Sequence, residues 1–315
     1  MLVIGGPTAS GKSGLALSLA ERAGGMVINA DSMQVYGVLH VVTARPSAAD
    51  EARAPHRLYG VVPPSERMSA ARWRDLALAE IRTAHATGHL PIVVGGTGLY
   101  LRTLMQGIAD MPDIPVAVRE ATLALQRDIG SPALHALLAE RDPETAARLN
   151  PGDTQRLVRA WEVLEATGHG ITWWQRHATP IPPAGLSFLP LVVEPPRDRL
   201  YAQCDARFLA MLEQGALDEV RQLAVLGLDP DLPAMKALGV PELLAHLRGE
   251  VPLADATARA QQMTRNYAKR QLTWFRHQLA AARRVDPGAW AHHSAIEQLY
   301  DSVMGDMQKK ISGRG

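Results

Sequence analysis

The sequence predicts an α/β fold, in which a core built on a parallel β-sheet is interrupted by an all-helical insertion. Near the N-terminus, short apolar runs alternate with segments of helical spacing, as in strand–helix–strand units. Between residues 112 and 187 the pattern is helical only, with proline and glycine at both ends. An apolar run returns at Phe188–Glu194, which indicates that the sheet continues beyond the insertion.

The composition limits the classes of protein to consider. Of 315 residues, 47% are hydrophobic and 21% are charged, so the chain can bury a core. The 33 Lys and Arg nearly balance the 32 Asp and Glu, which excludes a globally basic coat for nucleic acids. The single cysteine, Cys204, excludes an intramolecular disulfide, and no apolar run approaches the roughly 18–20 residues of a membrane span. We expect a cytoplasmic protein without a membrane partner, and a monomer because no apolar stripe is left for a second copy.

Five segments form the first half of the expected core. Short apolar runs predict buried strands, and apolar residues on one helical stripe predict helices. In chain order these are a strand at Leu2–Gly6, a helix at Ser13–Ala23, a strand at Met26–Ala30, a helix at Ala70–Ala86 and a strand at Pro91–Val94.

The rest of the chain is expected to be mainly helical. Helical patterns lie at Val116–Arg127, Pro132–Glu140 and Asp153–Thr167 within the insertion, and at Leu200–Glu213, Ala216–Leu226 and Ala258–Arg284 after it. The polar chain end predicts fraying. The expected domains are a discontinuous core of residues 1–111 and 188–305, a helical insertion of residues 112–187, and a disordered tail of residues 306–315.

The most specific short motif is GPTASGKS, which fits G-x-x-x-x-G-K-[ST] without a gap. A strand precedes it and a helix follows, so its backbone N–H groups are expected to form a nest for phosphate oxygens. Lys12 adds a full charge, and the Ser13 hydroxyl is the expected metal ligand, for Mg²⁺. This predicts a P-loop NTPase-like core. The expected polyphosphate-binding residues in the motif are Gly6, Pro7, Thr8, Ala9, Ser10, Gly11, Lys12 and Ser13, and the motif alone does not indicate which polyphosphate binds.

Asp31 is the acidic residue at the end of a predicted strand. A typical nucleotide hydrolase has a later apolar strand that ends in Asp, whereas here Pro91–Val94 leads into Gly-Gly-Thr-Gly. Because the carboxyl ends of parallel strands line the ligand crevice, Asp31 is expected to face the phosphate loop. A turn or helix-cap role is the alternative.

A further set of motifs resembles the bacterial tRNA dimethylallyltransferase family, also called isopentenyltransferases. The matching motifs occur in the family's order along nearly the whole chain, and the last is very specific. Besides the phosphate loop they are DSMQVY (Asp31–Tyr36), TARPS (Thr43–Ser47), PIVVGGTGLYL (Pro91–Leu101), DTQRLVRAWEV (Asp153–Val163), RFLAMLEQG (Arg207–Gly215) and TRNYAKRQLTWFR (Thr264–Arg276).

The resemblance implies a reaction. A dimethylallyl group passes from dimethylallyl diphosphate to N6 of the adenine just 3′ of the anticodon in tRNA. Asp31 is implied as the general base, and Thr97 as the residue that orients the amine. Lys12 stabilises the leaving diphosphate, which Arg207 also contacts. An arginine on a surface helix is the alternative interpretation of Arg207.

The resemblance also implies contacts with the anticodon stem-loop. From the core, the predicted tRNA-binding residues are Asp31, Ser32, Met33, Gln34, Thr97, Arg265, Lys269 and Arg270; from the insertion they are Arg119, Gln155, Arg156, Leu157, Val158 and Arg159.

The stretch Val251–Arg284 holds seven Lys and Arg against one acidic residue, which suits an RNA backbone. The stretch also contains the aromatic residues Tyr267, Trp274 and Phe275. They could stack on bases or pack in the core, and both interpretations stay open. The segment Gly37–Val42 departs from the family, which usually has Arg-Gly followed by Asp-Ile-Gly here.

Three other functions share some of these features. A small-molecule kinase shares the phosphate loop, an adenylate isopentenyltransferase shares the loop and the aspartate, and a non-catalytic RNA-binding protein shares the basic stretch. The basic C-terminal helix argues against the first two, and Asp31 beside a phosphate nest argues against the third.

Overall fold

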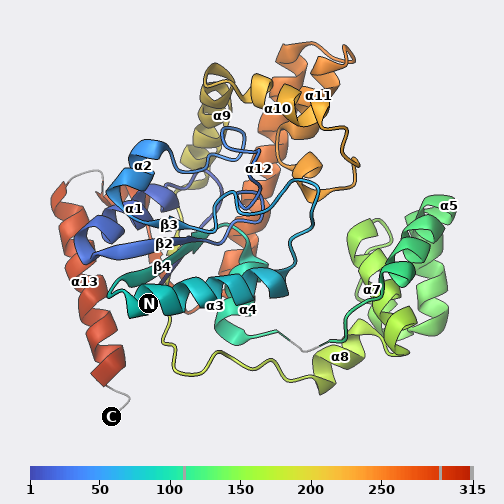
Figure 1. Ribbon diagram of the computed structural model, residues 1–315, viewed down its shortest axis with the longest axis horizontal. Helices are drawn as coiled ribbons and strands as arrows, with labels where there is room; N and C mark the ends of the chain where they lie inside the picture. Colours follow the sequence, from blue (N-terminus) through green and yellow to red (C-terminus); the bar gives the residue numbers. More distant parts are fainter. Residues whose placement is uncertain (109–110, 291–292, 313–315) are drawn as a thin grey trace. The chain divides into compact units, whose positions relative to one another are not determined.

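The structure is a computed structural model that describes residues 1–108, 111–290 and 293–312 (Figure 1). The chain divides into two compact units, one formed by Met1–Met105 and Pro183–Gly315, the other by Gln106–Pro182. Each unit is described by itself below. Among the described residues, no helix is long and apolar enough to cross a membrane.

The larger unit is built on a sheet of six strands, paired in parallel throughout in the order β3-β2-β4-β1-β5-β6. β1 lies in the middle, and its last residue, Gly5, is opposite Gly95 and Val192. The carboxyl ends of β1, β2 and β4 therefore meet at one edge of the sheet. The strands are β1 (Leu2–Gly5), β2 (Gly25–Asn29), β3 (His56–Arg57), β4 (Leu90–Gly95), β5 (Leu189–Val193) and β6 (Arg283–Val285).

Helices cover both faces of this sheet, because alternate strand residues point to opposite sides. Ile4 lies in one apolar cluster with Leu15 of α1 (Lys12–Ala23) and Val303 of α13 (His293–Ser312). Val3 lies in a second cluster with Trp73 of α3 (Ala70–Ala86). A sheet buried on both faces explains why its strands are continuously apolar in the sequence.

Most of the other helices of this unit contribute buried residues to the second cluster. The longest, α12, presents the small buried residues Ala256, Ala260 and Ala268 at spacings of four and eight positions, which lets it pack closely against α9 and α11. These helices are α2 (Ala48–Arg53), α4 (Gly98–Gln106), α9 (Arg197–Glu213), α10 (Ala216–Val225), η1 (Pro233–Lys236), α11 (Val240–Leu247), α12 (Leu253–Gln278) and η2 (Pro287–Trp290).

The smaller unit is helical in its described residues and has its own apolar core, which includes Leu134, Leu157 and Trp161. Its first helix bends at Gly130, whose φ of 78° and ψ of 166° are not helical, just before Pro132. This bend separates the two helices predicted there. The helices are α5 (Val116–Arg141), α6 (Pro143–Ala146), α7 (Thr154–Thr167) and α8 (Ile171–His177).

The end of the core differs from the prediction in two places. The long helix expected at Ala258–Arg284 ends at Gln278, and Arg283–Val285 pair with β5 as strand β6. The alanine- and arginine-rich sequence favours a helix, but pairing with the buried strand prevails.

The tail expected to be disordered from residue 306 continues α13 as far as Ser312. Met307 packs against the cluster beside α1, and Asp306 forms an ion pair with Arg283 at 3.3 Å. These contacts stabilise a segment whose polar sequence suggested fraying.

Candidate active site

The phosphate loop has the backbone geometry of an anion nest. Two residues have left-handed φ values, Ala9 at 61° and Gly11 at 85°, and Ser10 between them does not. Left-handed residues in alternation let successive N–H groups of a loop turn toward a bound anion. The free N–H groups of the first turn of α1 follow directly. The buried Ser10 hydroxyl has no hydrogen-bond partner within the part of the chain that the structure describes. A polar group without a partner in this loop is what an oxygen-rich ligand would satisfy.

Two cations lie at this loop. Lys12 Nζ donates to the carbonyl of Pro7 at 3.2 Å, and Arg207 of α9 donates to Thr8 Oγ1. Burial lowers the pKa of Lys12 to about 8, with Asp31 opposing the shift and Arg207 adding to it. Burial also lowers the pKa of Arg207. Two desolvated cations at one anion nest suit a ligand with the charge of a diphosphate.

Asp31 is held in a turn at the end of β2. Its carboxylate accepts the Met33 N–H at 3.0 Å, and its own N–H donates to Asn29 Oδ1 at 2.8 Å. Asn29 is fully buried, and its Nδ2 donates to the carbonyl of Leu58. The carboxylate is thus rigidly placed, and it lies close enough to Lys12 to raise the pKa of that ammonium.

Thr97 lies next to Asp31, from the neighbouring strand end. Its Oγ1 accepts the Ser32 N–H at 2.9 Å, and its N–H donates to the carbonyl of Ala30 at 3.2 Å. Tyr267 of α12 lies near both Asp31 and Thr97. Burial, reinforced by the Asp31 carboxylate, raises the pKa of Tyr267. A carboxylate, a hydroxyl and the phosphate loop therefore meet at one edge of the sheet.

Three glycines beside the site allow the side chains of helix α12 to pack closely against the backbone there. A Cβ added at any of three glycines would overlap a side chain of α12, and the pairs are Gly5 with Phe275, Gly96 with Gln271, and Gly98 with Trp274. Phe275 is 1% exposed, and Trp274 packs against the apolar cluster that contains Val3 and Trp73. Of the two roles left open for these aromatic residues, the structure supports packing.

The side chain expected to bind a metal at this site, that of Ser13, offers an oxygen ligand. Among the described residues, no group of three His, Cys, Asp or Glu is arranged to hold a metal ion. Ser13 is exposed at the first turn of α1, beside the nest. A hydroxyl completed by phosphate oxygens and water fits Mg²⁺, which rarely uses an all-protein cage.

The predicted tRNA-binding residues in the core differ in how far they are available. Ser32 and Met33 are partly exposed beside Asp31. The amide nitrogen of Gln34 donates to the carbonyls of Thr43 and Ala44, both at 2.9 Å, which leaves only its oxygen for a ligand.

On α12, the three predicted cations also differ. Lys269 and Arg270 are exposed and line a hollow of about 380 Å³ with Asn266 and Thr273. Arg265 is ion-paired with Asp205 of α9 instead. A ligand of Arg265 would have to compete with that carboxylate.

In the insertion, the predicted residues separate into surface and core. Gln155 is exposed, and Arg156 is 73% exposed while paired with Asp153 at 3.3 Å. Arg119 and Arg159 both pair with Glu162, whose side chain is 7% exposed. The prediction for Leu157 and Val158 is corrected, because their side chains are buried at 0% and 8% exposure in the core of the insertion.

The divergent segment Gly37–Val42 is held by a residue that the sequence analysis missed. One Glu219 carboxylate on α10 accepts the N–H groups of His40, Val41 and Val42 at 2.7–3.0 Å. No local pattern indicates a contact across nearly 180 residues. Asn29 was also missed, although a polar residue inside the apolar run MVINA is a signal.

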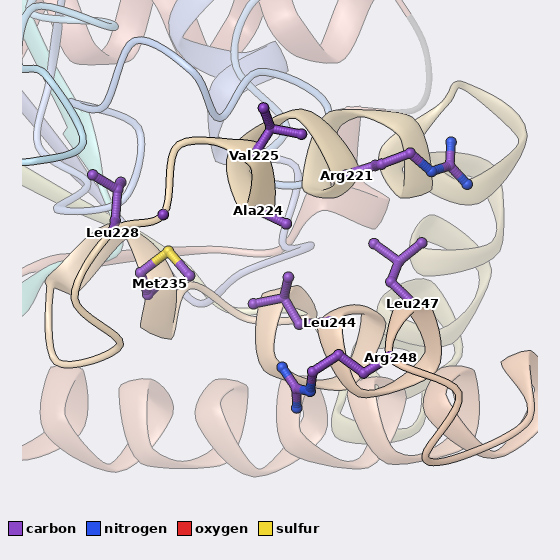
Figure 2. Close-up of a pocket in the computed structure, with 9 residues that line it drawn as sticks. Arg221, Ala224, Val225, Leu228, Met235, Leu244, Leu247 and Arg248 are labelled. Atoms are coloured by element: carbon purple, nitrogen blue, oxygen red, sulfur yellow. The ribbon is translucent and has the colours of Figure 1, made fainter.

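A larger hollow, of about 600 Å³, lies on α10 and α11 rather than at the phosphate loop. Figure 2 shows aliphatic side chains along it, with Arg221 and Arg248 at its edge. Both arginines are ion-paired, with Asp218 and Glu250. It therefore lacks the desolvated cations that distinguish the phosphate loop.

Comparison with known proteins agrees with this geometry. The family model of the IPP transferases matches residues 34–278. The chain is 70% identical over 296 residues to the tRNA dimethylallyltransferase of Rhodospirillum centenum, covering 94% of both chains. It is 51% identical to that of Paramagnetospirillum magneticum, covering 98% of this chain and 95% of the relative.

Solved structures show the same similarity. The tRNA isopentenylpyrophosphate transferase of Bacillus halodurans aligns with a TM-score of 0.72 and 33% identity, over 99% of this chain and 98% of that one. A eukaryotic dimethylallyltransferase acting on tRNA aligns with a TM-score of 0.76 and 29% identity, over 91% of this chain and 73% of that one. The phosphate loop, the Asp31–Thr97 pair and these matches together show that the chain belongs to the IPP transferase family.

Proposed function

We propose that this enzyme transfers a dimethylallyl group from dimethylallyl diphosphate to N6 of the adenine 3′ to the anticodon in tRNA. The observation that carries the proposal is the meeting of a cationic phosphate loop with Asp31 and Thr97 at one edge of the sheet. An electrophile with a diphosphate leaving group needs the first feature, and a weakly basic amine needs the second. The named relatives, which are tRNA dimethylallyltransferases, support the same reaction.

The loop serves the leaving group. As the C1–O bond of the donor breaks, its electron pair remains on the diphosphate, and negative charge increases there. The inward N–H groups, Lys12 and Arg207 stabilise that charge without having to reorganise. Mg²⁺, when held by Ser13 and the diphosphate, supplies further positive charge.

Asp31 serves the acceptor. The adenine amine forms the new N6–C1 bond and becomes positively charged, so it must lose one proton. The Asp31 carboxylate is positioned to accept that proton, and the Thr97 hydroxyl to orient the amine.

Recognition of tRNA follows from the exposed cations. Lys269 and Arg270 on α12 and Arg156 on α7 suit phosphates of an anticodon stem-loop. The target base must leave its stack to reach Asp31, which costs a few kcal/mol that these contacts offset. The cytoplasmic location and the monomeric state remain predictions from the sequence.

The test is a parallel assay with labelled dimethylallyl diphosphate and Mg²⁺ on unmodified tRNA, on AMP, and on ATP without the prenyl donor. We expect label in tRNA and no hydrolysis of ATP. Label in AMP alone would make the enzyme an adenylate isopentenyltransferase, and ATP turnover without prenyl transfer would indicate a kinase.

A further inference from the structure

Gln271 is a buried polar residue on the inner side of α12. It is 5% exposed, in the buried stripe that also carries three alanines, Thr264, Leu272 and Phe275. A glutamine that gave only packing would leave a carboxamide without hydrogen bonds in an apolar layer, which is costly. Its position therefore calls for partners.

Those partners are the backbones of the two loops that form the site. Thr8 N–H donates to Gln271 Oε1 at 2.8 Å, and Gln271 Nε2 donates to the carbonyl of Gly96 at 2.8 Å. Gly96 has no room for a Cβ, because the amide nitrogen of Gln271 occupies that space. One carboxamide thus connects the phosphate loop with the turn that carries Thr97.

Each of these backbone positions is adjacent to a reacting group. Thr8 also accepts a hydrogen bond from Arg207, and it lies four residues before Lys12. Gly96 precedes Thr97, whose hydroxyl accepts the Ser32 N–H beside Asp31. The separation of Thr8 and Gly96 therefore determines how far the diphosphate lies from the base and the amine.

We propose that Gln271 is a positioning residue, which sets the distance between the phosphate loop and the Thr97 turn and so between C1 of the donor and the adenine amine. The proposal rests on the proposed function, since it assigns donor and acceptor to these two loops. Both the oxygen and the nitrogen of the Gln271 carboxamide are hydrogen-bonded to backbone groups. The side chain therefore contributes to the positions of the two loops and not to the affinity for donor or tRNA.

Loss of this bridge affects the chemical step. A displacement of about 1 Å between reactants lowers rates by as much as about 10²-fold. For Gln271→Met, which keeps length but loses both hydrogen bonds, we expect a 10- to 100-fold lower single-turnover rate. The KM values for donor and tRNA should stay within about threefold of the wild type.

The Gln271→Glu variant distinguishes a role of Gln271 in positioning the two loops from a role in packing alone. A neutral carboxyl group can accept from Thr8 N–H and donate to the Gly96 carbonyl, whereas the ionised form cannot donate. Its rate, divided by the wild-type rate at each pH, should therefore rise as the pH falls from about 8 to about 6. A packing role alone predicts no such dependence.

Two controls complete the experiment. Gln278→Met makes the same chemical change at an exposed position of the same helix and should react at the wild-type rate. Phe275→Leu lowers thermal stability through the core without touching the bridge, and it should retain a rate near the wild type.

Wild-type rates for Gln271→Met, losses no greater than those of Phe275→Leu, or a flat relative pH profile for Gln271→Glu would overturn the proposal. A wild-type enzyme that transfers no label to tRNA would instead refute the proposed function, so the two failures are distinguishable.

Discussion

The indole ring of Trp274 on α12 lies directly against the backbone of Gly98, where a Cβ would overlap three of its ring carbons. Gly98 begins α4, immediately after Thr97. The long helix that carries the exposed cations is thus packed onto the turn that carries the acceptor site. Glycine at position 98 is needed for space, since its φ is not in the left-handed range.

Gly98→Ala should therefore force Trp274 or the turn to move. We expect a loss of about 1–3 kcal/mol in the free energy of unfolding, typical of overpacking, and at least a tenfold loss of turnover. Urea denaturation and a transfer assay measure both. Gly305→Ala, where a Cβ would meet nothing within 4 Å, is the control and should be neutral or slightly stabilising. Wild-type stability of Gly98→Ala would show that the contact is loose.

The lowered pKa of Lys12 predicts a pH effect on activity. The free enzyme loses this positive charge as the pH rises through about 8, so kcat/KM for the donor should fall above that pH. A bound diphosphate stabilises the charged form, so kcat should fall only at higher pH. A kcat/KM that is unchanged between pH 7 and pH 9 would contradict the assignment.

The same shift predicts the stability of Lys12→Met. The pKa is lower in the folded protein than in the unfolded chain, where it is near 10.5, so the unfolded state binds more protons between these values. Charged Lys12 is therefore destabilising below pH 8. The variant should be more stable than the wild type at pH 7, by at most about 3 kcal/mol, and this gain should vanish as the pH rises to about 10.5. Thermal unfolding across this range measures it, and equal stability at pH 7 would be the contrary result.

Asp31→Asn should remove the base while keeping its shape, because an amide oxygen can still accept the Met33 N–H. We expect turnover to fall by roughly a hundredfold or more, with tRNA affinity nearly unchanged. Rapid-quench kinetics and filter binding separate the two quantities. Unchanged turnover would remove Asp31 from the mechanism.

Arg156→Ala should weaken tRNA binding and its dependence on salt. Loss of one phosphate contact lowers the slope of log K against log salt by about 0.7–0.9. Arg221→Ala, an exposed arginine of α10 beside the second hollow, is the control and should leave the slope unchanged. An unaltered slope for Arg156→Ala would mean that this side chain does not contact RNA.

Local signals were sufficient for the parts of the site that lie within short motifs. The phosphate loop, Asp31 after β2 and Thr97 after β4 follow from apolar runs and the residues at their ends. Contacts between distant segments carry no such signal. Gln271 bridges to Thr8 and Gly96 across 263 and 175 positions. The hydrogen-bond partners of its carboxamide come within reach only when α12 is packed onto the sheet.

The errors in the fold have the same origin. β6 is three residues long, and only its pairing with β5 outweighs a helix-favouring sequence. Arg283 was predicted as part of a basic helix, but it pairs with Asp306 of α13. Leu157 and Val158 belong to the family motif DTQRLVRAWEV, whose resemblance implied contacts with tRNA, yet helical spacing places them on the buried side of α7.

The central claim is that one site activates the diphosphate and deprotonates one particular adenine. The direct measurement is a single-turnover reaction of donor labelled at C1 with two anticodon stem-loops, one with adenine and one with guanine 3′ to the anticodon, followed by nucleoside analysis. We predict label only on N6 of that adenine, with one diphosphate released for each label transferred. Label in the guanine stem-loop, or on another nucleoside, would contradict the account.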